Sequence, residues 1–190
     1  MTDFHALPPE EQLAILDATA AAALALYDLP AGAEARLLNL SENAIYKVEA
    51  PDGRAYALRL HRDGYHSKQA IASELAWAVD LRQAGIVTTP APLPGRDGAL
   101  IQDVQHPALH RPRHVVLFDW EPGAEPVIGE DLAGHFETLG ETAARMHIHA
   151  RQWQRPRWVT RFTWDFDTAL GEDKPHWGLW RNGVGPDARG

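Results

Sequence analysis

The 190-residue sequence contains no cysteine. Disulfide bonds, a cysteine nucleophile and cysteine-type zinc sites are therefore excluded, and a cytoplasmic location is expected.

Long hydrophobic runs are missing too. The most apolar stretch, residues 18–26, is about half the length that spans a bilayer, and Asp17 and Asp28 flank it. Because Glu10 and Glu11 lie in a start without basic residues, we expect neither a secretory signal nor a membrane partner.

Basic residues are scarce relative to acidic ones. The chain has 18 Lys and Arg against 26 Asp and Glu, which gives a formal net charge of -8. Such a chain repels phosphate backbones, so no nucleic-acid partner is expected. The arginines at 151, 155, 157 and 161 are interpreted as a solvated surface. Hydrophobic residues make up 45% of the chain, which is enough to bury a core.

Helical periodicity predicts three helices. The first begins at Pro8 and Pro9 and ends at Leu29-Pro30-Ala31-Gly32, and the second spans about 67–84, with Ser67 as N-cap. The third spans about 130–151. Its predicted apolar face consists of Leu132, Phe136, Leu139, Ala143 and Met146.

Alternating hydrophobicity predicts strands between these helices. The predicted strands are 36–40, 44–49, 54–61, 98–105 and 114–120. Pro51-Asp52-Gly53 predicts a turn between the second and third strands, because proline presets φ and glycine accepts the left-handed conformation. A proline-rich connection covers 89–94. Five of the seven tryptophans follow residue 152, in a tail without a clear long element.

A possible cation–carboxylate pair links the second hairpin strand to the second helix. Arg59 lies on the strand, and Glu74 lies on the helix that follows. Such a pair can fix a cation where it meets the phosphates of a nucleotide. A structural or surface pair, or no contact at all, is the alternative interpretation.

The strand at 114–120 ends in aromatic residues and breaks at Pro122-Gly123. A segment of this kind is a natural hinge between two lobes, and its exposed backbone groups can read an adenine edge. The alternative is a core strand followed by an ordinary loop.

Five motifs occur in order on these elements: SENAIYKV at 41–48, YALRLHR at 56–62, SELAW at 73–77, FDWEPG at 118–123 and LGETAARMH at 139–147. With them, residues 36–182 resemble the aminoglycoside phosphotransferase family, which includes type II homoserine kinases and choline kinases. The resemblance implies an α+β, protein-kinase-like N-lobe. Its twisted antiparallel sheet would have about five strands plus helices, followed by the first helices of an incomplete C-lobe.

The resemblance also implies the residues that bind the nucleotide. They are Ser41, Asn43, Ala57, Arg59, Glu74, Phe118, Asp119 and Trp120. Arg59 stands where the family usually has a phosphate-binding lysine, Ala57 where a small residue packs on adenine, and Glu74 where a glutamate orients the cation. Ser41 and Asn43 belong to the loop over the phosphates.

Two departures from the kinase pattern stand out. The phosphate loop has no G-x-G-x-x-G motif, and position 59 is arginine, whose reach and geometry differ from those of lysine. The backbone at 118–120 matches the adenine-binding hinge.

The catalytic loop of the fold, of the type H-G-D-x-x-x-x-N, and the following metal-binding aspartate are not found in the chain. Asp165-Phe166-Asp167 looks like a magnesium motif but has no catalytic loop upstream, so we reject it. No catalytic residue and no metal ligand is therefore assigned. ATP and magnesium are implied by the resemblance alone, and the magnesium ligands are not in this chain.

Three regions follow: an N-terminal helix at 1–34, a kinase-like N-lobe at 35–122, and the start of a C-lobe at 123–190 that looks truncated. We expect the nucleotide-binding portion of an ATP-dependent phosphotransferase that acts on a hydroxyl of a small molecule. One alternative is a non-catalytic nucleotide-binding or interaction module, whose Trp-rich C-terminal surface would form a homodimer or bind a partner. Another is an unrelated structural α+β protein.

Overall fold

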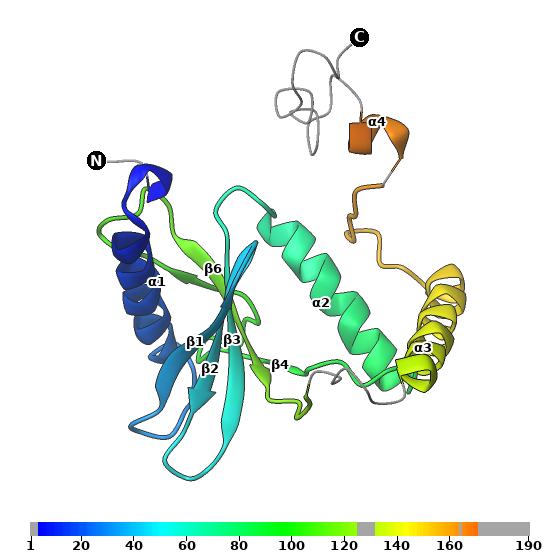
Figure 1. Cartoon of the computed structure of the whole chain (residues 1–190), viewed down its shortest axis with the longest axis horizontal. Coiled ribbons are helices and arrows are strands. Elements are labelled where there is room, and N and C mark those ends of the chain that lie inside the picture. The colour runs from blue at the N-terminus through cyan, green and yellow to red at the C-terminus, as the bar shows by residue number, and fades with distance from the viewer. Residues whose placement is uncertain (1–3, 125–131, 164, 171–190) are drawn as a thin grey trace. The chain divides into compact units, whose positions relative to one another are not determined.

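The computed structural model describes residues 4–124, 132–163 and 165–170. It divides into two compact units, Met1–Val159 and Thr160–Gly190. The first unit contains every described element except α4 (Figure 1). The elements are η1 (Phe4–Ala6), α1 (Pro9–Leu24), β1 (Glu34–Leu40), β2 (Asn43–Glu49), β3 (Ala55–His61), α2 (Lys68–Gln83), β4 (Pro92–Leu93), β5 (Gln102–Val104), β6 (Arg113–Asp119), α3 (Leu132–Gln152) and α4 (Phe166–Leu170).

Helix α1 begins where the prolines predict. Proline at the first helical position costs no hydrogen bond, and Glu10 and Glu11 in the first turn complement the helix dipole. The helix ends at Leu24, earlier than the predicted end at 29–32. The prediction was late because Tyr27, which fits the helical spacing, is buried from the turn that follows the helix.

The sheet is antiparallel throughout, with the order β1-β2-β3-β6-β4, and β5 also pairs with β6. The predicted turn joins β2 to β3, and Gly53 has φ 86°. The sheet has six strands rather than about five, because Pro92–Leu93, predicted as connection, pairs with β6. The strand predicted at 98–105 shortens to Gln102–Val104.

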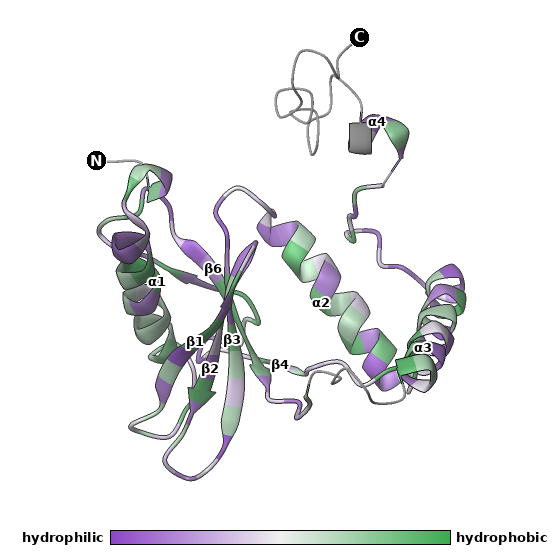
Figure 2. Cartoon of the chain, viewed as in Figure 1, coloured by the Kyte–Doolittle hydropathy of each residue, from purple (hydrophilic) through white to green (hydrophobic). Residues whose placement is uncertain are grey.

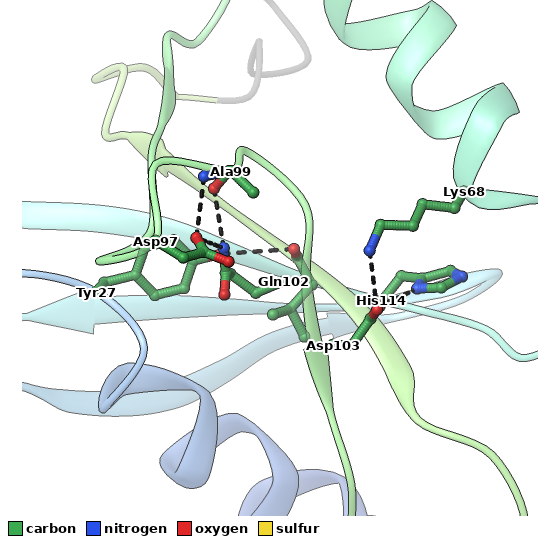
Figure 3. A network of polar contacts seen from close by, with 8 residues as sticks. Tyr27, Lys68, Asp97, Ala99, Gln102, Asp103 and His114 are labelled. Atoms are coloured by element: carbon green, nitrogen blue, oxygen red, sulfur yellow. Dashed lines mark hydrogen bonds and ion pairs between the residues drawn. The ribbon is translucent and has the colours of Figure 1, made fainter.

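A local polar network explains this shorter strand (Figure 3). The Asp97 carboxylate accepts hydrogen bonds from the Ala99 N–H at 2.9 Å and from Gln102 Nε2 at 2.6 Å. Gln102 Nε2 also donates to the Ala99 carbonyl at 2.9 Å. These bonds hold residues 95–99 in a turn, with Gly98 at φ 81°, so that strand pairing begins only at Gln102.

Alternate residues of the strands face two different helices, which lie on opposite sides of the sheet (Figure 1). The face toward α1, called the α1 face, carries the larger core. Its strand residues include Tyr46, Val48, Leu58, Leu60, Val115 and Leu117. On the opposite face, called the α2 face, Ile71 and Leu75 of the helix pack against Val116.

Helix α2 follows its predicted boundaries closely. The Ser67 hydroxyl accepts a hydrogen bond from the Ala70 N–H at 3.1 Å, so Ser67 is the N-cap. Gly85, with φ 66°, follows the helix. Of the predicted apolar face, Ile71 and Leu75 are buried, whereas positions 78 and 79 are only half-buried.

Helix α3 forms as predicted, but its apolar face is not buried. Phe136 is 68% exposed and Leu139 is 60% exposed. In the described part of the chain no element covers this side, and hydrophobic residues alternate with hydrophilic ones over the helix (Figure 2). None of the described helices has the length and apolar character that a bilayer crossing requires.

The α1-face core predicts a measurable asymmetry between two leucines. Leu58 is completely buried, whereas Leu38 on the edge strand β1 is 44% exposed. We expect Leu58→Ala to lower the free energy of unfolding by about 2–5 kcal/mol because it leaves a cavity, and Leu38→Ala by much less. Urea denaturation of both variants measures this difference. Equal losses would contradict the assignment of the core.

Candidate functional site

Three rows of paired residues cross the α2 face of the sheet. The pairings Lys47↔Ala57 and Ala57↔Phe118 form the first row, nearest the end of β6. Arg59, opposite Ile45 and Val116, lies in the second, and the Asn43↔His61 pair forms the third. Directly opposed residues point to the same side of a sheet, so these positions share one surface. That surface runs from the predicted hinge to the loop between β1 and β2.

Arg59 is held by two neighbours. Its Nη1 donates to Glu74 Oε1 at 2.7 Å, and its guanidinium carbon lies 5.1 Å from the centre of the Phe118 ring. Both partners are partly buried, so the pair is less screened by water than a surface pair. The contact between strand and helix that the sequence predicts is therefore present.

Arg59 also keeps free donors. Its Nε and Nη2 are buried, and among the described residues neither has a hydrogen-bond partner. A guanidinium presents its donors in a planar fork that suits two oxygens of a phosphate or carboxylate. Unpaired buried donors are costly, so this position favours an anionic ligand.

The predicted hinge residues lie at the end of β6. Phe118 packs with the α2-face cluster, and the Trp120 ring lies 5.3 Å from Lys47 Nζ. The backbone N–H of Asp119 already donates to the Ala91 carbonyl at 2.9 Å. The side chains of Phe118 and Trp120 thus face the predicted site, while the Asp119 donor is used within the fold.

The predicted phosphate loop is tied to the end of β3. The Ser41 N–H donates to the Asn43 carbonyl at 3.1 Å, and Asn43 Oδ1 accepts from the Arg62 N–H at 3.3 Å. Ser41 and Asn43 border a cavity of about 280 Å³ that also touches Phe4 and Leu16. The structure brings Arg59, Glu74, Ala57 and Phe118 together but gives neither loop residue a contact with Arg59.

Lys47 is a cation on this surface that the sequence analysis did not assign to the site. It lies directly opposite Ala57, and its Nζ donates to Glu49 Oε1 at 2.6 Å. The signal was present in the sequence, because Ile45 and Lys47 alternate in phase with Ala57 and Arg59 across the hairpin.

Helix α2, which carries Glu74, is held by residues that follow the hinge. Asp80 Oδ2 lies 2.7 Å from His149 Nε2 of α3, and Arg82 Nη1 lies 2.7 Å from Glu121 Oε1. Gln69 Nε2 also donates to the Trp158 carbonyl at 2.9 Å. These contacts at both ends of α2 fix the helix, and with it the carboxylate that holds Arg59.

The segment Asp165-Phe166-Asp167 lies at the start of helix α4. Asp165 Oδ1 accepts a hydrogen bond from the Thr168 N–H at 2.8 Å, which is the geometry of an N-cap for α4. Across residues 4–124, 132–163 and 165–170, no group of three or more His, Asp or Glu side chains could hold a metal ion. The end of the predicted Trp-rich tail, 171–190, lies outside the described residues.

Comparison with known proteins places the fold. The model of the phosphotransferase enzyme family matches residues 34–184. A microcompartment-associated aminopropanol kinase of known structure is 41% identical over 93% of this chain, with a TM-score of 0.77. An amicoumacin kinase, solved in complex with AMP-PNP, Ca²⁺ and Ami, is 22% identical over 82% of this chain, with a TM-score of 0.64. A search of curated proteins gave no match.

The predicted kinase-like α+β fold is thereby confirmed. The chain covers 53% of the aminopropanol kinase and 44% of the amicoumacin kinase, so it spans about half the length of the kinases that it matches.

The buried histidine of the third row predicts a pH dependence of stability. Burial, and then the nearby Arg59, His114 and His66, lower the pKa of His61 to about 3. Below about pH 6.5 His61 is therefore protonated in the unfolded chain but stays neutral in the folded chain. This difference lowers the free energy of unfolding progressively as the pH falls below about 6.5.

In His61→Gln the free energy of unfolding should fall less steeply between pH 6.5 and pH 5, by up to about 1.4 kcal/mol per pH unit. Urea denaturation across this range measures the slope, with the exposed His147→Gln as control. Identical slopes in the wild type and His61→Gln would refute the prediction.

Proposed function

The chain belongs to the phosphotransferase enzyme family, and from this premise we propose that it is the nucleotide-binding portion of an ATP-dependent kinase. In this proposal the α2 face holds ATP, with the base toward Phe118 and Trp120 and the phosphates toward Arg59. The phosphoryl acceptor is a hydroxyl of a small molecule.

One observation carries the proposal: Arg59 is oriented by Glu74 and keeps two buried, unpartnered donors on a surface bordered by aromatic side chains. A phosphate group would satisfy those donors. Ala57, between Lys47 and Phe118 in the first row, leaves room beside the strand where a larger side chain would project. These features fit a planar base and a charged phosphate chain in adjoining positions.

Arginine at position 59 would bind phosphate with a geometry that differs from that of lysine. Glu74 occupies Nη1, so the guanidinium plane is set, while the buried Nε and Nη2 have no hydrogen-bond partner among the described residues. A lysine would offer a single compact charge at the same position. Contact with Phe118 further limits the rotamers of Arg59, which lowers the entropy lost when a phosphate binds.

The protein's contribution to phosphoryl transfer would be positioning and charge neutralisation. Arg59 orients the phosphates and offsets their charge, Glu74 orients Arg59, and the contacts of α2 with His149 and Glu121 keep Glu74 in place. A bound Mg²⁺ would neutralise phosphate charge. The described residues fit the nucleotide but offer no cluster for the metal, so we assign no metal ligand and no catalytic base to them.

The acceptor class rests on the relatives. The kinase of known structure that is 41% identical to this chain bears the name aminopropanol kinase, which makes a short amino alcohol the first acceptor to test. We assign no described residue to acceptor binding.

Substitution of Arg59 tests the nucleotide site. We expect Arg59→Ala to weaken AMP-PNP binding about 10- to 100-fold, because charge-assisted hydrogen bonds to the phosphates are lost. Arg54→Ala is the matched control, since it removes an exposed ion pair with Asp52 at the other end of β3. Isothermal titration calorimetry measures both. Unchanged affinity in Arg59→Ala would remove this residue from the site.

The Glu74→Gln variant tests how Arg59 is positioned. It keeps the size of the side chain but removes the charge that fixes the guanidinium, so nucleotide affinity should fall less than in Arg59→Ala. In the double variant the two losses should not add, because both act through one contact. Fully additive losses would show that Glu74 does not act through Arg59.

The non-catalytic module remains a second candidate because we assign no catalytic base among the described residues. Phosphorus-31 NMR with ATP, Mg²⁺ and 1-amino-2-propanol separates the two functions when this chain is compared with a longer one. Phosphomonoester formation by the longer chain supports the kinase. Nucleotide binding without turnover by either chain supports a non-catalytic nucleotide-binding module, and absence of nucleotide binding by both contradicts both of these functions.

A further inference from the structure

A second cationic site lies beyond Arg59, where β3 ends and β6 begins. A cavity of about 420 Å³ opens there between the loop that leads into α2 and the segment at 111–114. We call it the strand-end cavity. Its basic and imidazole side chains are His61, Arg62, His66, Arg111, Arg113 and His114. In a chain with a net charge of -8, a cavity lined by three arginines is a local exception.

Arg113 is the central observation. The residue is only 4% exposed, and within the described residues its guanidinium has neither a carboxylate partner nor a hydrogen bond, while its Nε is fully buried. Its contact is with the Phe4 ring, 4.9 Å from the guanidinium carbon. Burial lowers the pKa of Arg113, yet a guanidinium stays charged in proteins. The charge of Asp63 raises the pKa of Arg113 but forms no ion pair with it. A buried charge without an ion-pair partner is costly, and an anion in the cavity would relieve that cost.

His61 adds a second unsatisfied group. It is 3% exposed, and neither ring nitrogen has a hydrogen-bond partner in the described structure. A neutral imidazole offers one N–H donor. Ser67, the N-cap of α2, also borders the cavity, so the positive end of a 16-residue helix lies at its wall.

The carboxylates of the cavity do not neutralise this set. Asp103 is engaged by Lys68 Nζ at 2.8 Å and by His114 Nδ1 at 2.6 Å (Figure 3). Asp63 is exposed and forms no ion pair with Arg113 within 4 Å. Arg62, Arg111 and Arg113 therefore outnumber the one remaining carboxylate.

From Arg113, His61 and the helix terminus we propose that the strand-end cavity binds the phosphate group of a small phosphomonoester or inorganic phosphate. A dianion matches three arginines better than a monoanion does, and the tetrahedral oxygens can accept from guanidinium and imidazole together. The cavity exceeds the size of one phosphate ion and falls within the range of small-ligand pockets. Arg59 does not line this cavity, so the proposal does not depend on the proposed nucleotide binding.

The test uses the whole chain with two probes, inorganic phosphate and methyl phosphate, each titrated against chloride at matched ionic strength. Thermal unfolding and calorimetry report binding. We expect both probes to stabilise the wild type beyond chloride, and the tighter one identifies the source of the phosphate group.

Arg113→Met keeps an apolar contact for Phe4 and should weaken phosphate binding about tenfold or more. Arg111→Gln changes an exposed wall residue and should weaken it several-fold without unfolding risk.

Two control variants test whether the phosphate binds in the strand-end cavity. Arg96→Gln removes an exposed arginine outside the cavity and should leave phosphate binding unchanged. Arg59→Ala should also leave it unchanged, even where that variant loses AMP-PNP. No stabilisation beyond chloride, or equal phosphate binding in the wild type and both cavity variants, would overturn the proposal. Loss of phosphate binding in Arg59→Ala alone would place the phosphate at the nucleotide site and would also overturn it.

Discussion

The contact between Arg59 and Glu74 joins the two structural parts on which the candidate site depends. A guanidinium on the sheet and a carboxylate on the packed helix meet at 2.7 Å, above an aromatic ring. The helix can supply that carboxylate only because Ile71 and Leu75 hold it on the α2 face and because residues after the hinge contact both of its ends. The core and the ion pair therefore support the same geometry, and the two free donors of Arg59 are its consequence.

Local sequence signals predicted most of the fold and suggested the pair of Arg59 and Glu74. The turn at 51–53 sets the hairpin, and hairpin alternation puts Arg59 on the same face as Ala57. A pair between Arg59 and Glu74 was one interpretation of the sequence, with no contact as an alternative, and the structure shows the contact. The family resemblance then supplied the roles. Lys47 was missed although the same alternation places it beside Ala57.

Features that depend on distant contacts could not be predicted. The two-residue strand β4 exists through its pairing with β6, and the Asp97–Gln102 network shortens β5. The exposed side of α3 carries apolar residues at the spacing of a buried helix face. Periodicity predicts which face of a helix is apolar, but it does not predict whether another element covers that face. The strand-end cavity combines residues from 61–67 with residues from 103–114, and the burial of Arg113 follows from the fold rather than from any motif.

Nitrogen-15 NMR of the arginine side chains gives the most direct measurement of the central claim. With AMP-PNP added to the chain, the Arg59 Nε resonance should shift and its proton should become protected from exchange, because this buried donor gains a phosphate oxygen. The Arg54 Nε resonance, one residue before strand β3 begins, should not move. Saturable AMP-PNP binding with an unchanged Arg59 resonance would contradict the account.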